Sequence, residues 1–235
     1  MNIDWFYYMT AILMQAGLFV VTYPLAKFFA RFEVLGKENL RDLPRGPIII
    51  MANHASQLDP GLLNLGIPWT HRLRPIFAVA LSKIEYLHLP LGKLLYGGKI
   101  FWLGGAYPAY KKKSSLHDSL PHHLDVLQKN MTVGIFPEGK ISKDGKFGVA
   151  HPGVALMAHK SNAVVIPAYL YGGYFMEASD FFRRRRKLRV IFGKPIRFLD
   201  YADPSREYDR IDYRKPAEDM FDEVKKLAKD WNEKV

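Results

Sequence analysis

Residues 47–60 read PIIIMANHASQLDP, an apolar run that passes directly into a polar turn and then a proline. Residues 47–52 contain no polar side chain, which is typical of a strand buried on both faces of a parallel sheet. Asp59 and Pro60 have the residue types of a helix start, with Asp at the N-cap and Pro at the first helical position. The stretch therefore predicts a strand, a turn and a helix in succession, which is the repeating unit of α/β proteins.

The same alternation continues along the rest of the chain. Helical spacing predicts a helix that begins at residue 60 and others over residues 115–129, 153–159 and 216–229. Short apolar runs predict further strands over residues 33–35, 75–80, 98–102, 132–136, 164–169 and 187–192. We expect residues 33–235 to form a single α/β domain, with a largely parallel central sheet flanked by helices.

Residues 5–26 carry no charge and many aromatic side chains. A helix over this range would be about 33 Å long at about 1.5 Å per residue, close to the hydrocarbon thickness of a bilayer. Aromatic residues concentrate at membrane interfaces, and no positive side chain precedes the run, so a cleaved signal peptide is not predicted. Residues 1–32 are predicted to form an apolar helical segment that spans the cell membrane or lies along it, with the remaining chain on the cytoplasmic face. A buried core helix is the alternative.

The chain is basic and lacks cysteine. It has 34 Lys and Arg against 23 Asp and Glu, a net charge of +11. Such a charge attracts polyanions, whether nucleic acid, anionic lipid surfaces or phosphorylated substrates such as coenzyme A esters. No nucleic-acid-binding signature is present, so we predict no nucleic-acid partner. The absence of cysteine excludes disulfides and cysteine nucleophiles.

Two polar turns follow predicted strands. His54 and Asp59 come after the first strand, at the edge where ligands of open α/β sheets bind. A carboxylate on one imidazole nitrogen fixes the tautomer and leaves the other nitrogen free to accept a proton, so this pair could deprotonate an alcohol. Glu138 and Gly139 come after the strand over residues 132–136. Each turn alone is equally compatible with an ordinary helix cap or a polar loop.

Taken together, the two turns resemble the glycerophospholipid acyltransferase family, whose best-known members make phosphatidic acid from 1-acylglycerol 3-phosphate. The first family block, N-H-x4-D, is matched by Asn53, His54 and Asp59, and the third, F-P-E-G followed by Ser, is matched by residues 136–139 and Ser142. The second and fourth blocks are matched in outline by residues 103–111 and 165–167. The resemblance covers about residues 33–198.

The resemblance implies a reaction without cofactor, metal or covalent acyl-enzyme. His54, oriented by Asp59, would act as general base on the acceptor hydroxyl, which attacks the thioester of an acyl-CoA or acyl-carrier-protein. Glu138 and Gly139 would position the glycerol portion of a lysophospholipid acceptor. The predicted substrate-binding residues are those of the matched blocks and their neighbours: Asn53, Lys111, Glu138, Gly139, Lys140 and Ser142.

Two positions depart from the family pattern. Lys111 stands where the family often has Arg, and Ile141 stands where F-P-E-G-T-R-S has its Arg. Arg is the better bidentate phosphate ligand. Phosphate recognition is therefore predicted to fall on Lys111, Lys112 and Lys140, unless the acceptor is not a simple phosphomonoester.

Other functions stay open at this stage. The acceptor could be another lysophospholipid or a lipid alcohol, or the same His–Asp pair could serve a thioesterase or lipase, although no G-x-S-x-G elbow is present. A membrane- or nucleic-acid-binding protein without catalysis would also explain the charge. The basic run over residues 183–187 could be a solvated loop, or it could contact anionic headgroups or the phosphates of the acyl donor. Because Phe181 and Phe182 precede it, we favour contact with a membrane surface of anionic lipids.

Overall fold

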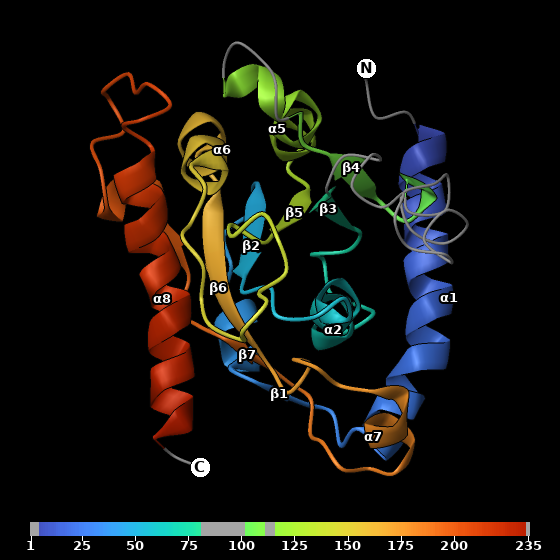
Figure 1. Cartoon of the computed structure of the whole chain (residues 1–235). Coiled ribbons are helices and arrows are strands. Elements are labelled where there is room, and N and C mark those ends of the chain that lie inside the picture. Colours follow the sequence, from blue (N-terminus) through green and yellow to red (C-terminus); the bar gives the residue numbers. More distant parts are fainter. Residues whose placement is uncertain (1–4, 81–101, 111–115, 234–235) are drawn as a thin grey trace.

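Eight strands form one central sheet in the computed structural model, which describes residues 5–80, 102–110 and 116–233 (Figure 1). Their order is β1-β7-β6-β2-β5-β3-β4, and β8 pairs with β6. The bounds are β1 Glu33–Leu35, β2 Ile48–Ala52, β3 Ile76–Ala80, β4 Ala106–Pro108, β5 Thr132–Ile135, β6 Val164–Tyr171, β7 Arg189–Phe192 and β8 Ile196–Arg197.

The sheet is largely parallel, as the sequence predicts. Strands β6, β2, β5, β3 and β4 run parallel, whereas β7 and β8 pair antiparallel to β6. Strand β2 lies in the middle, where Ile50 pairs with Gly134 of β5 and with Ile166 of β6. All five residues of β2 are buried. Its continuous apolar sequence follows from this position, because helices cover both faces.

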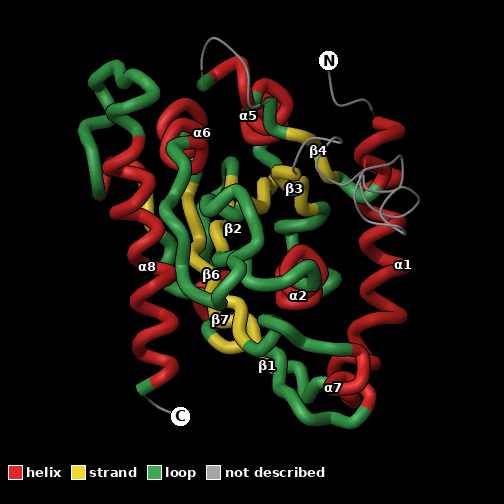
Figure 2. Tube along the Cα trace, viewed as in Figure 1, coloured by secondary structure: helices red, strands yellow, loops and turns green. Residues whose placement is uncertain are grey.

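Helices lie on the two faces of the sheet (Figures 1 and 2). On the face of Ile49 and Met51, a core cluster joins the sheet to α5, α6, α8 and the start of α1. On the face of Ile48 and Ile50, a second cluster joins it to α2 and the end of α1. The helices are α1 Trp5–Phe29, α2 Asp59–Gly66, α5 Pro121–Gln128, α6 Gly153–Ser161, α7 Ala178–Phe182 and α8 Arg214–Asn232, with 3-10 turns at Lys37–Leu40, His117–Ser119 and Phe198–Asp200.

The N-terminal helix α1 runs alongside the domain, with α7 near its C-terminal end (Figure 1). Only Tyr7, Ala11, Gln15 and Ala26 of α1 are buried. Gln15 is the polar member of this stripe: its side-chain Nε2 donates to the carbonyls of Ile76 (2.8 Å) and Gly104 (3.0 Å), and its Oε1 accepts from the Ile76 N–H. The helix is thus hydrogen-bonded to strand β3. The predicted division of the chain after residue 32 stays a prediction.

Two predicted elements differ from the structure. The strand expected over residues 98–102 is wrong at Trp102, which is helical, and residues 98–101 lie outside the described residues; the strand of this region is β4. The helix expected over residues 115–129 is divided. A 3-10 turn at His117–Ser119 precedes α5, which begins at Pro121 because proline has no N–H to continue an earlier helix.

Candidate active site

His54 and Asp59 are hydrogen-bonded to each other at the C-terminal end of β2. The distance from His54 Nδ1 to Asp59 Oδ2 is 3.0 Å. The same Oδ2 accepts the backbone N–H groups of Ala55 and Ser56, both at 2.7 Å. An oxygen that accepts two N–H groups is an acceptor for the imidazole as well, so Nδ1 carries the ring proton and Nε2 has a free lone pair. The contact expected from the five-residue spacing is therefore present.

Asp59 does not serve as a helix cap, which corrects one sequence expectation. Helix α2 begins at Asp59 itself, its N-cap residue is Leu58, and no side chain caps it. The carboxylate instead faces back toward the turn and is only 1% exposed. Its oxygen Oδ2 accepts hydrogen bonds from the turn and from the imidazole. It accepts none from the N–H groups at the start of α2.

The His54 ring is held between Asp59 and an aromatic wall. It stacks on Phe136 of the second polar turn, with ring centroids 4.4 Å apart and an interplanar angle of 22°. The side chain is 14% exposed. One ring edge is thus fixed by a carboxylate and one face by an apolar ring, while the imidazole still reaches a cavity.

Glu138 connects the two polar turns. Its Oε1 accepts the backbone N–H of His54 (2.8 Å), and its Oε2 accepts that of Gly148 (2.6 Å). The side chain is 4% exposed, and this burial raises the pKa of its carboxyl above the ordinary value, against the lowering effect of the two N–H groups. The carboxylate therefore supports the backbone that carries His54. Its predicted contact with the acceptor stays a prediction.

The remaining residues of the matched turns also fix the backbone. The Asn53 side chain pairs with both backbone groups of Leu170 in β6. Gly139 has φ 64°, and a Cβ there would lie 2.7 Å from His151, so the turn requires glycine. The backbone N–H of Ser142 donates to the His54 carbonyl (2.8 Å), and its hydroxyl donates to the Lys146 carbonyl. The Ser142 bond fixes the backbone of His54 directly, and the Asn53 pair fixes the residue before it.

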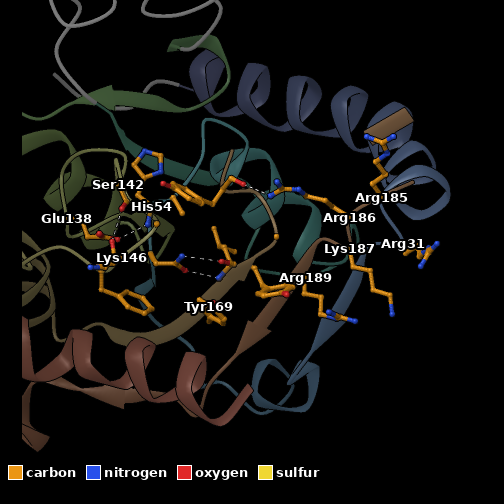
Figure 3. Close-up of a pocket in the computed structure, with 18 residues that line it drawn as sticks. Arg31, His54, Glu138, Ser142, Lys146, Tyr169, Arg185, Arg186, Lys187 and Arg189 are labelled. Carbon is orange, nitrogen blue, oxygen red and sulfur yellow. Dashed lines mark hydrogen bonds between the residues drawn. The ribbon is translucent and has the colours of Figure 1, made fainter. Parts of the chain in front are cut away.

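A basic cleft of about 670 Å³ opens beside His54 (Figure 3). Among the described residues that line it, Glu138 is the only acidic one, and both of its oxygens are bonded to backbone N–H groups. Six cationic side chains of the described chain line the same cleft: Arg31, Lys146, Arg185, Arg186, Lys187 and Arg189. The cleft is therefore suited to anions.

A second cavity, an apolar groove of about 730 Å³, lies next to the cleft. Its walls come from α1, α2, α7 and the segment before α7, with Leu25, Leu62 and Phe181 among the lining residues. Ile141, at the position where the family often has Arg, faces this groove and does not line the basic cleft. Ala55, Ser142 and Tyr174 line both cavities, so the two meet beside the His54 turn.

The lysines predicted to bind phosphate are not the cations of the cleft. Lys140 is exposed and lines neither cavity, while Lys111 and Lys112 lie outside the described residues. The sequence interpretation missed Arg31, Lys146 and Arg189 entirely. Motif spacing gave no signal for them, because they come from three distant segments that only the fold brings together.

Comparison with known proteins agrees with this geometry. The profile of the family described as Acyltransferase matches residues 31–171, which is more than half of the chain. The chain belongs to the Acyltransferase family. Members of this family are acyltransferases, and the predicted enzyme class is confirmed.

Relatives of this acyltransferase carry more specific names. It is 29% identical to the chloroplastic 1-acyl-sn-glycerol-3-phosphate acyltransferase LPAT1 of Arabidopsis thaliana, over 73% of this chain and 48% of the relative. It is 28% identical to a 1-acyl-sn-glycerol-3-phosphate acyltransferase of Limnanthes douglasii, over 74% and 57% respectively. The chain thus spans about half the length of the curated relatives it matches.

A solved structure supports the fold of the acyltransferase. The crystal structure of the 1-acyl-sn-glycerophosphate acyltransferase PlsC from Thermotoga maritima superposes with a TM-score of 0.54 at 18% sequence identity, covering 94% of each chain. The α/β fold with an apolar N-terminal helix predicted from the sequence is confirmed.

Proposed function

We propose that the protein transfers a fatty acyl chain from acyl-CoA or acyl-carrier-protein to the free hydroxyl of 1-acylglycerol 3-phosphate. The product would be phosphatidic acid, an intermediate of phospholipid biosynthesis. One observation carries the proposal: the His54–Asp59 pair lies where a basic cleft meets an apolar groove. A phosphorylated lipid acceptor and an acyl thioester need both kinds of surface beside the base. The names of the relatives support the acceptor.

The first step is removal of a proton from the acceptor hydroxyl. Nδ1 of His54 carries a proton held by Asp59, so Nε2 is the nitrogen that takes the hydroxyl proton. The imidazole becomes positively charged, and the buried Asp59 carboxylate stabilises this charge. The two backbone N–H groups on Asp59 keep the carboxylate oriented throughout.

The acyl transfer then follows directly. The hydroxyl oxygen forms a bond to the thioester carbon, giving a tetrahedral intermediate, and the carbon–sulfur bond breaks as the carbonyl re-forms. The leaving thiolate takes the proton from His54 Nε2, which returns the base to its starting state. The products are an ester and a free thiol, and no group of the protein is acylated.

In this scheme each cavity binds a different part of the substrates. The apolar groove between α1, α2 and α7 holds an acyl chain, since apolar surface is buried there at a gain of about 25 cal/mol per Å². Lys146 lines the cleft on the side of His54, to which Ser142 connects it by hydrogen bonds (Figure 3). We assign the phosphate of the acceptor to Lys146, since this phosphate is carried on the carbon next to the one that bears the reacting hydroxyl.

The N-terminal helix supports a location at a membrane. Among the described residues, α1 is the one helix long and apolar enough to cross a bilayer, yet it contacts the domain from Tyr7 to Ala26 (Figure 1). A spanning orientation would draw the charged domain beside it into hydrocarbon, which is costly. The helix therefore lies in the interface plane. We place the domain on the cytoplasmic face of the cell membrane, where its donors are found.

An acyl-transfer assay in detergent tests the proposal. Radiolabelled acyl-CoA and acyl-carrier-protein are offered with lysophosphatidic acid, glycerol 3-phosphate or a neutral lysolipid, for wild type and His54→Ala. We expect transfer to lysophosphatidic acid, with kcat lowered roughly 10²- to 10⁴-fold in the variant, since that is the usual contribution of a general base. The exposed His117 provides the control substitution His117→Ala, which should keep full activity.

Other outcomes of the same assay contradict the proposal. Transfer that persists in His54→Ala removes His54 as the base. Donor hydrolysis that does not depend on any acceptor indicates a thioesterase. Transfer to a neutral lysolipid alone assigns a different acceptor to the same fold.

A further inference from the structure

The run of arginines before β7 is divided between two surfaces. Arg184 has a left-handed backbone, φ 56°, and its guanidinium lies over the ring of Phe28 in α1, 4.8 Å from the centroid. Arg185, Arg186 and Lys187 instead line the basic cleft, whereas Arg183 and Arg184 do not. The predicted membrane contact of the run stays a prediction, and the alternative contact with the phosphates of the donor concerns the second half, which lines the cleft.

The cations of the cleft differ in how far they are already neutralised. Arg186 donates to the Tyr174 carbonyl and lies 3.4 Å from an Asp180 oxygen, and Arg189 pairs with Glu33. The terminal nitrogens of the other four make no hydrogen bond or ion pair with any residue in the described part of the chain: Arg31, Lys146, Arg185 and Lys187. Glu33 attracts Lys187 and Asp144 attracts Lys146 electrostatically. Within that part of the chain, no hydrogen bond or ion pair occupies the terminal nitrogens of the four, so they are available for a ligand.

The available cations lie at two ends of the cleft. Figure 3 shows Lys146 with His54, Glu138 and Ser142 on one side, and Arg31, Arg185 and Lys187 on the other, with Tyr169 and Arg189 between them. The side chains of Arg185 and Lys187 point in opposite directions there. Of the four available cations, Lys146 is the one on the side of His54, so we assign to it a phosphate close to the reacting hydroxyl. The far end therefore needs a ligand whose negative charge is well separated from the reacting atoms.

We propose that Arg31, Arg185 and Lys187 bind the phosphate groups of coenzyme A, so that acyl-CoA is the donor. This inference rests on the proposed acyl transfer. In acyl-CoA the pantetheine arm separates the thioester from a diphosphate and a 3′-phosphate, which matches a cleft with His54 at one end and three free cations at the other. Guanidinium groups bind phosphate oxygens in bidentate geometry. The phosphopantetheine of a carrier protein has a single phosphodiester, which would leave most of this charge unused.

Binding of coenzyme A is measured first, by titration calorimetry in an uncharged detergent, because it does not depend on catalysis. The variants are Arg185→Gln and Lys187→Gln, and the matched control is Arg184→Gln from the same run but outside the cleft. We expect the Kd for coenzyme A to rise about tenfold or more in each cleft variant, because each loses a charged hydrogen-bond donor. Arg184→Gln should match wild type. Pantetheine, which has no phosphate, should bind weakly and equally to all four proteins.

Steady-state kinetics then show whether these cations bind the phosphates of acyl-CoA or the phosphate of lysophosphatidic acid. The cleft variants should raise the KM for acyl-CoA about tenfold, and leave kcat, the KM for acyl-pantetheine and the KM for lysophosphatidic acid unchanged. A higher KM for lysophosphatidic acid alone would assign these cations to the acceptor and overturn the proposal. Equal losses in Arg184→Gln, or wild-type binding of coenzyme A no tighter than pantetheine, would also overturn it. If wild type shows no acyl transfer, the proposed function fails, and the titration still decides whether the site binds coenzyme A.

Discussion

At the scale of single residues, both carboxylates of the site are occupied by backbone N–H groups. Asp59 accepts from Ala55 and Ser56, and Glu138 accepts from His54 and Gly148. Neither turn has a regular ladder to satisfy these donors, so the acidic side chains replace it. For catalysis this means that the imidazole of His54 is held in position twice: Glu138 fixes its backbone and Asp59 fixes its ring.

The buried Glu138 carboxyl should make stability depend on pH. Its pKa is raised above 4.5 by burial, so between 4.5 and the higher folded-state value the folded protein binds more protons than the unfolded chain. Stability from this group therefore falls as pH rises through that window. Glu138→Gln cannot ionise and lacks this dependence, although its amide leaves one backbone N–H unpaired, at about 1–3 kcal/mol.

Denaturant unfolding of wild type and Glu138→Gln, from about pH 4 to about pH 7, checks this expectation. The free energy of unfolding of wild type should fall relative to the variant as pH rises. All other titrating groups are shared and cancel in the difference. Parallel pH profiles would show that the carboxyl titrates alike in the folded and unfolded states.

The sequence predicts this site well where residues are close along the chain. The His54–Asp59 contact follows from five-residue spacing after a strand, and the Phe136–Glu138 turn follows from the end of β5. The basic cleft does not follow in this way. Arg31 and Lys187 meet only because β1 and β7 pair side by side, and no local pattern encodes that pairing.

At the scale of secondary-structure elements, helix α1 depends on one polar residue for its attachment to β3. Gln15 is 3% exposed and satisfies both backbone groups of Ile76. Gln15→Leu introduces an apolar side chain of similar size and leaves these groups unpaired, so we expect a loss of about 2 kcal/mol or more in unfolding free energy. Chemical denaturation in detergent measures it. The exposed Gln128 gives the control Gln128→Leu, which should change stability little, and an equal effect in both would show that the Gln15 bonds contribute nothing.

Strands β2 and β4 show how burial and length affect what the sequence can predict. Strand β2 has an unbroken apolar sequence because it is buried on both faces, so its pattern is unambiguous. Strand β4 is three residues long and has one buried side chain, Tyr107. Three residues give no periodicity to read, so the sequence does not predict β4.

At the scale of the whole molecule, the apolar surface of α1 should control membrane binding. Leu13 and Val20 are 64% and 70% exposed, and such side chains gain about 1.5–3 kcal/mol each when buried. Leu13→Lys with Val20→Lys is expected to lower the fraction of protein that sediments with anionic liposomes at least tenfold. The control is Ile211→Lys, since Ile211 is equally exposed but precedes α8 on the opposite side of the sheet (Figure 1). Liposome binding that survives the double substitution would remove α1 as the membrane contact.

The junction of the two cavities has a further consequence for the proposed reaction. The groove is walled by α1 and α7, which both present exposed apolar side chains, whereas the cleft is walled by charged residues. The two products differ in the same way: one is a two-chain lipid and the other a water-soluble thiol. Each can leave through the cavity that suits it, so neither has to pass the other. The enzyme then acts as a phase-transfer catalyst, which takes an acyl chain from water and delivers it to the bilayer without releasing a lipid into the aqueous phase.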